Sequence, residues 1–169
     1  MRSNDYHFVS RWCFQARIEE VAAILEEIES LPDWWPMVYL QVRILDPGAN
    51  NGIGRKVDLL TKGRLPYQLR WQFTVVDNNN PYGFTIEAEG DFVGRGVWRL
   101  VQNGPLAEVE FDWRIRAEKP ILKSMSWAMK PVFEWNHRWA MDQGQECLCA
   151  EIKRRRRTAN KLDLAAAAR

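Results

Sequence analysis

Residues 131–157 read PVFEWNHRWAMDQGQECLCAEIKRRRR, and small side chains recur in this stretch at four-residue spacing. The repeated positions are Val132, Asn136, Ala140, Gly144 and Leu148. Because residues four apart share one face of an α-helix, the pattern predicts a helix from about Leu122 to Arg157 with one face that is thin in its middle. Two interpretations stay open: the thin face leaves room for a bound molecule, or it lets another part of the chain approach closely.

Two features of the sequence indicate where this helix begins and ends. Pro131 lacks a backbone N–H, so it is predicted to kink the helix or to mark the start of its regular part. The chain after Arg157 ends in four alanines and an arginine, and residues 158–169 are predicted to be a frayed tail. Residues 1–157 are predicted to form a single domain, since 169 residues suit one core.

The composition is rich in aromatic residues and nearly neutral in charge. Nine tryptophans and seven phenylalanines indicate either a large core or a cavity lined by rings. A net charge of +2 offers no global attraction for nucleic acid, so no nucleic-acid partner is expected. The positive charge is local, in the run Lys153, Arg154, Arg155, Arg156 and Arg157. This run is either a solvated helix end that complements the helix dipole or a contact for an anionic membrane surface or RNA.

Cysteines and histidines are few and scattered. Cys13, Cys147 and Cys149 have no disulfide or metal-motif spacing, and His7 and His137 are the only histidines, so neither a metal site nor a cofactor is expected. The first ten residues lack the charged and apolar segments of a secretion signal, and no apolar run reaches bilayer length. The sequence therefore predicts a cytoplasmic protein.

Alternation of apolar and polar residues predicts seven strands. They cover residues 6–14, 38–44, 55–62, 67–77, 82–89, 92–102 and 107–117, separated by clusters of Gly, Asn, Asp and Pro. In the fourth strand Leu69, Trp71 and Phe73 share the apolar face, and Arg70 is expected to face solvent. The sixth strand is ambiguous, because Phe92, Trp98 and Leu100 compete for the inner face with Val93, Val97 and Val101.

An amphipathic helix is predicted after the first strand. Apolar residues recur at helical spacing from Ile18 to Ile28, and Pro32 is expected to end the helix near Leu31. Asp33, Trp34 and Trp35 then form an aromatic corner before Pro36.

The order of strand, helix, aromatic corner, six strands and closing helix is similar to the helix-grip fold of the START and birch-pollen-allergen (SRPBCC) superfamily. Three local motifs resemble proteins described as polyketide cyclase or dehydrase: the corner from Leu31 to Pro36, the stretch from Glu89 to Trp98, and Trp135-Asn136-His137 with Met141 and Gly144. The resemblance implies an α+β fold, in which a curved antiparallel sheet of about seven strands wraps around the long C-terminal helix, with a short N-terminal helical pair.

The same resemblance implies a pocket between sheet and helix that binds a hydrophobic or aromatic small molecule, such as a lipid, a quinone or a polyketide-like compound. The alternative is a polyketide cyclase/dehydratase that catalyses intramolecular aldol condensation and dehydration, with Asn136 and His137 as candidate catalytic residues. The expected ligand-binding wall is Trp35, Leu59, Tyr67, Trp71, Phe73, Phe84, Trp98, Phe111, Trp113, Met129, Phe133 and Ala140.

Overall fold

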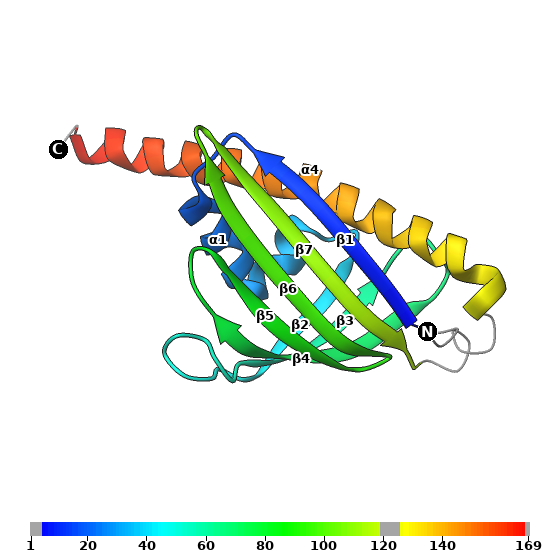
Figure 1. Cartoon of the computed structure of the whole chain (residues 1–169). Helices are drawn as coiled ribbons and strands as arrows, with labels where there is room; N and C mark the ends of the chain where they lie inside the picture. Colours follow the sequence, from blue (N-terminus) through cyan, green and yellow to red (C-terminus); the bar gives the residue numbers. More distant parts are fainter. Residues whose placement is uncertain (1–4, 119–125, 168–169) are drawn as a thin grey trace.

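The computed structural model describes residues 5–118 and 126–167 and contains one seven-stranded antiparallel sheet. The sheet order is β1-β7-β6-β5-β4-β3-β2, so every strand but β1 pairs with its neighbour in sequence (Figure 1). The strands are β1 (Asp5–Phe14), β2 (Tyr39–Asp46), β3 (Lys56–Lys62), β4 (Gln68–Asn78), β5 (Gly83–Gly90), β6 (Phe92–Asn103) and β7 (Leu106–Ala117). The seven predicted strands are confirmed.

One face of the sheet is buried and aromatic. In β4, Leu69, Trp71 and Phe73 are buried, whereas Arg70 is exposed and forms an ion pair with Asp58 at 3.1 Å. The ambiguity in β6 is resolved in favour of the aromatic set, since Trp98 is buried and its neighbours on the other face point outward. A single strand cannot settle this question, because its two faces carry apolar residues of similar hydrophobicity.

A glycine in β6 makes room for rings from the next strand. A Cβ added at Gly96 would lie 2.9 Å from Cε2 of Phe111 and 2.8 Å from Cε3 of Trp113. Phe111 in turn stacks on Trp98, with ring centroids 4.1 Å apart. The absent side chain at Gly96 is therefore what lets these large rings lie flat on the sheet.

The N-terminal helical region differs from its prediction near Pro32. Helix α1 (Ile18–Glu26) is followed by a 3-10 turn, η1 (Ile28–Ser30), and a short helix, α2 (Leu31–Trp34). Pro32 lies in the first turn of α2, where a missing N–H breaks no helical hydrogen bond. Helix α1 ends at Glu26, before the expected end near Leu31, and Pro32 lies in the next helix, so the proline is not what ends α1.

Helix α4 (Ser126–Ala167) extends beyond its predicted end at Arg157 (Figure 1), and the first residues of the prediction, 122–125, lie outside the described residues. Pro131 lies inside α4, so it does not mark the start of the helix. The helix also continues past Arg157, with exposed side chains over residues 158–167, since that segment contains no Gly or Pro. None of the helices in the described segments carries an apolar run that would reach across a membrane.

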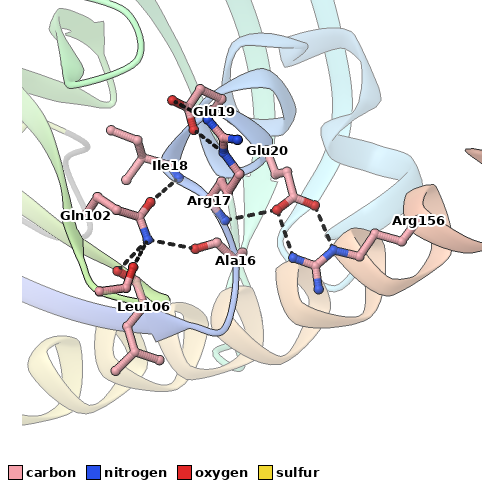
Figure 2. Close-up of polar contacts among 9 residues, drawn as sticks. Ala16, Arg17, Ile18, Glu19, Glu20, Gln102, Leu106 and Arg156 are labelled. Carbon is pink, nitrogen blue, oxygen red and sulfur yellow. Dashed lines mark hydrogen bonds and ion pairs between the residues drawn. The ribbon is translucent and has the colours of Figure 1, made fainter.

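A polar network ties α1 to the β6–β7 hairpin (Figure 2). The side-chain amide of Gln102 donates to the carbonyl oxygens of Ala16, Gly104 and Leu106. Its Oε1 accepts from the backbone N–H of Ile18 at 2.8 Å. One side chain thus satisfies groups from the β1–α1 junction and the hairpin together, and it fixes where α1 begins.

A second contact ties α1 to α4. Arg156 donates two hydrogen bonds to the carboxylate of Glu20, at 2.7 and 2.8 Å, and Glu20 also accepts from the backbone N–H of Arg17 (Figure 2). The hydrogen bonds from Arg156 are the main cause that lowers the pKa of Glu20 to about 2.

The other cations of the predicted basic run are partly neutralised in the same way. Arg154 pairs with Glu151, and Arg155 pairs with Glu151 and Glu27. Within residues 5–118 and 126–167, Lys153 and Arg157 have no ion-pair partner. Contact with a membrane stays a prediction, and it would depend mainly on these two cations.

We expect Glu20→Gln to lower the free energy of unfolding by about 1 kcal/mol at pH 7, because Arg156 loses a charged, partly exposed partner. The pKa of Glu20 is lower in the folded state than its usual 4.5, so the stabilisation is complete above pH 4.5 and is lost as the pH falls towards 2. Urea titrations of both proteins at pH 7 and pH 3 should show the difference shrinking.

The control is Glu29→Gln, which changes an exposed glutamate with no recorded ion pair in the part of the chain that the structure describes. Equal losses of stability for Glu20→Gln and Glu29→Gln would contradict a specific role of the Glu20–Arg156 pair.

Candidate functional site

A cavity of about 180 Å³ lies between the buried face of the sheet and α4. Every strand contributes at least one side chain to its lining, and the helical region from α1 to α2 closes one end. The lining is mostly apolar and aromatic. It includes these residues expected from the sequence: Trp35, Tyr67, Trp71, Phe73, Phe84, Trp98, Phe111, Trp113, Phe133, Asn136, His137 and Ala140.

Two residues of the expected wall are not found in the described lining of the cavity. Leu59 is fully buried but is not among the residues that line the cavity, whereas its cross-strand neighbour Trp71 is. Met129 lies in α4, but its side chain is outside the described residues.

Several lining residues were not assigned to the wall from the sequence. Tyr6 and Phe8 come from the aromatic face of β1, and Thr61 comes from β3. Alternation places Tyr6 and Phe8 on one face of a strand, which was the only available signal. It does not show that β1, at the edge of the sheet, lies beside α4 and so reaches the cavity.

The thin face of α4 serves both purposes considered from the sequence. Near its middle the indole of Trp35 packs on Gly144, where an added Cβ would lie 2.4 Å from Cζ2 of the ring. One turn earlier, Ala140 and Asn136 face the cavity. The glycine therefore permits a close contact, and the next small residues leave space.

Two residues that line the cavity, Tyr6 and Trp35, carry a buried hydrogen-bond donor without a partner among the described residues. Oη of Tyr6 and Nε1 of Trp35 are buried, and no described residue accepts a hydrogen bond from either. The indole of Trp71 is different, because its Nε1 donates to Oγ1 of Thr61 at 3.0 Å. A buried donor without a partner costs about 1–3 kcal/mol, so a bound acceptor atom would be favoured at Tyr6 and at Trp35.

The tyrosines at the cavity remain protonated at neutral pH. Burial, with a smaller contribution from Tyr6, raises the pKa of Tyr67 to about 12. Burial also raises the pKa of Tyr6, reinforced by the charge of Glu134, and it raises the pKa of Tyr39. These hydroxyls are donors of hydrogen bonds and not bases.

His137 is also uncharged at neutral pH. Its ring stacks on Phe8 with a centroid distance of 4.1 Å, and Oγ of Ser10 lies 3.5 Å from Nε2. Burial lowers the pKa of His137 from 6.5 to about 4. An ordinary histidine titrates near neutrality and can then transfer protons, but burial removes that property from His137.

Asn136 is engaged with the segment between β3 and β4. Its Oδ1 accepts hydrogen bonds from the backbone N–H groups of Arg64, at 2.7 Å, and Leu65, at 3.4 Å. The neighbouring residue Gly63 is packed so closely that an added Cβ would lie 2.3 Å from the Asn136 amide. The guanidinium of Arg64 lies 5.6 Å from the ring of Trp135. Asn136 therefore holds the β3–β4 segment against α4 at the edge of the cavity.

Among the described residues, no three His, Cys, Asp or Glu side chains lie close enough together to hold a metal ion. The ionisable residues of the described cavity lining are Tyr6, Tyr39, Tyr67, His137 and Lys62. The chemistry that this wall offers is apolar contact, ring stacking and donation of hydrogen bonds.

The comparison with protein families gives one match. The family model described as "Polyketide cyclase / dehydrase and lipid transport" matches residues 9–148. No curated protein matches the chain.

Solved structures with the same fold include proteins with different descriptions. The Zhui aromatase/cyclase from Streptomyces sp. R1128 has a TM-score of 0.69 and 16% identity, covering 92% of this chain and 98% of that one. A START superfamily protein from Mycobacterium smegmatis has a TM-score of 0.66 and 14% identity, covering 88% and 97%. A point mutant of norcoclaurine synthase from Thalictrum flavum, in complex with a transition-state analogue, has a TM-score of 0.58 and 14% identity, covering 90% and 96%. These similarities confirm the helix-grip fold, and at such low identity they show the fold alone.

We expect the imidazole of His137 to titrate with a midpoint near pH 4 in an NMR titration, because burial disfavours its charged form. His137→Phe identifies the resonance and keeps a ring to stack on Phe8. The imidazole of His137 binds a proton below about pH 6.5 in the unfolded chain, but only near pH 4 in the folded chain. The wild type should therefore lose about 2 kcal/mol relative to His137→Phe as the pH falls from 6.5 to 4. A midpoint near 6.5 would contradict the buried, neutral state.

We expect Asn136→Ala to increase hydrogen exchange at the amides of Arg64 and Leu65 about tenfold, because both lose their acceptor. The matched control is Trp135→Ala, which removes the ring beside Arg64 and leaves both hydrogen bonds in place. Equal protection in the wild type and in Asn136→Ala would show that Asn136 does not hold this segment.

Proposed function

Because the chain belongs to the polyketide cyclase/dehydrase and lipid transport family, we propose that its cavity binds one small, largely apolar molecule with a flat ring and a hydrogen-bond acceptor. The unpartnered donors of Tyr6 and Trp35 at an otherwise apolar wall are the observation that carries the proposal. They favour an acceptor such as a carbonyl oxygen.

The size and shape of the cavity support a compact ligand. A dry, engineered cavity of roughly 150 Å³ holds one benzene molecule, whereas drug-sized ligands occupy about 300–1,000 Å³. At about 180 Å³ the cavity suits a body of one or two rings. The stacked rings of Trp98, Phe111 and Trp113 offer flat surfaces to such a body. Among the candidate classes, a quinone or an aromatic polyketide provides both the ring and the carbonyl, whereas a saturated lipid chain provides neither.

The alternative, cyclisation and dehydration of a poly-β-ketone chain, receives less support from this geometry. General acid–base catalysis works best with a pKa near the working pH. The pKa of His137 is about 4, that of Tyr67 is about 12, and Oδ1 of Asn136 already accepts two backbone hydrogen bonds. The same groups are suited to binding, in which no proton has to move.

A matched pair of ligands tests the role of Tyr6. Acetophenone and α-methylstyrene have the same shape, but only acetophenone has a carbonyl oxygen. We expect Tyr6→Phe to weaken acetophenone binding about tenfold and to leave α-methylstyrene binding unchanged, because the variant removes one hydrogen bond and keeps the ring. Isothermal titration calorimetry of both proteins with both ligands gives the four dissociation constants.

Tyr82→Phe is the control, since it removes the hydroxyl of an exposed tyrosine outside the cavity lining. If neither compound binds the wild type, the proposal of a ring-binding cavity is wrong. If Tyr6→Phe weakens both compounds equally, Tyr6 supports the fold of the cavity and does not recognise the carbonyl.

A further inference from the structure

A second hollow, of about 620 Å³, lies beside the cavity and is lined differently. Its wall is formed by the end of α1, by the turn between β2 and β3 and by the turn between β4 and β5. Figure 1 shows both turns at the same end of the sheet as α1. We refer to it as the outer hollow. Asparagine side chains dominate its lining: Asn50, Asn51, Asn78, Asn79 and Asn80.

The outer hollow and the cavity share part of their walls. Leu25, Ile28 and Phe84 line both. Leu25 and Ile28 are buried in the helical region, whereas Phe84 is only partly buried and lies near the start of β5. The Phe84 ring stacks on Trp98, with centroids 6.0 Å apart, so it extends from the aromatic wall towards the asparagines. Phe84 therefore separates an apolar space from a polar one.

The polar groups of the outer hollow suit a partner rich in hydroxyl groups. The Asn78 amide nitrogen donates to Oε1 of Glu26 at 3.1 Å and to the carbonyl oxygen of Asn51 at 2.8 Å. These two bonds fix the amide orientation, and Oδ1 of Asn78 is left buried with no donor among residues 5–118 and 126–167. A hydroxyl group can donate to this oxygen and accept from a neighbouring amide, as sugars do with asparagine side chains.

Charge does not favour an ionic partner. Arg55 lines the outer hollow, but it donates from Nη1 to the carbonyl oxygen of Glu26 and from Nε to that of Pro47. Glu27 pairs with Arg155. Glu26, the third charged residue of the lining, accepts a hydrogen bond from Asn78. All three charged groups are thus engaged within the protein, and the asparagine amides are neutral donors and acceptors.

We propose that the outer hollow is a second subsite, which receives the polyhydroxylated part of a ligand whose ring occupies the cavity, with Phe84 as the movable partition between them. This inference rests on the proposed binding function and extends it to a substrate class: a ring compound that carries a sugar or a similar polyol. The cavity holds the ring by apolar contact, and Asn78 and Glu26 hold the hydroxyl groups.

The test uses anisole and phenyl β-D-glucopyranoside, which carry a methyl group and a glucosyl group on the same phenol oxygen. Isothermal titration calorimetry compares the wild type with Glu26→Ala and Phe84→Ala. Glu26→Ala should weaken glucoside binding about fivefold and leave anisole binding unchanged. Phe84→Ala should strengthen glucoside binding at least tenfold relative to anisole, because the partition is removed. Phe84→Leu replaces Phe84→Ala if the alanine variant does not fold.

An NMR spectrum reports the location of the sugar directly. The side-chain amide signal of Asn78 should shift on addition of the glucoside and stay in place on addition of anisole. Glu29→Ala, which changes an exposed glutamate outside the hollow, is the control and should alter neither affinity.

The outcomes separate the two proposals. If anisole binds but the glucoside binds neither the wild type nor the Phe84 variant, the second subsite is wrong and the ring-binding cavity stands. Glucoside binding that Glu26→Ala does not change, without a shift at Asn78, also overturns the subsite. If neither compound binds, the ring-binding function is wrong and the subsite with it.

Discussion

The contact between Trp35 and Gly144 sets how closely the long helix approaches the aromatic interior. A Cβ at Gly144 would overlap the indole, so any larger residue would move the helix or the ring. Trp35 also meets Trp12 edge to face and stacks on Trp34, and it thereby joins the helix to β1 and to the corner after α2. Trp35 packs on α4 at Gly144, and one turn earlier the same face of the helix, at Ala140, borders the cavity. The position of α4 therefore determines where the cavity lies. The space for a ligand is a consequence of this packing.

The chemistry of the cavity follows from its burial. Aromatic side chains exclude water, and this burial lowers the pKa of His137 to about 4 and raises the pKa of Tyr67 to about 12. Among the described lining residues, Tyr6 and Trp35 carry buried hydrogen-bond donors without a partner. An apolar wall with a few oriented donors binds a ring and orients its acceptor, and this combination is consistent with a family whose description includes both cyclisation and transport.

The sheet was largely predictable from local patterns. Alternation in β4 and β7 shows which residues share a face, since side chains in a strand point to opposite sides in turn, and clusters of Gly, Asn and Pro mark the ends. Prolines were misleading for the helices. Pro32 lies in the first turn of α2, where no helical hydrogen bond is lost, and Pro131 lies inside α4. Local rules state the cost of a proline, but they do not fix its position within a helix.

The sequence by itself determined the order of the elements, the apolar face of the sheet and the thin face of the last helix, because each depends on the spacing of residues that are close along the chain. Only the tertiary structure decided which small residues on that face pack against a ring and which border a cavity, and that Asn136 holds the β3–β4 segment. It also decided that the pKa of His137 falls and that the hydroxyl of Tyr6 has no hydrogen-bond partner among residues 5–118 and 126–167. These properties depend on distances between segments up to about 130 residues apart, such as Ser10 and His137, which no local pattern encodes.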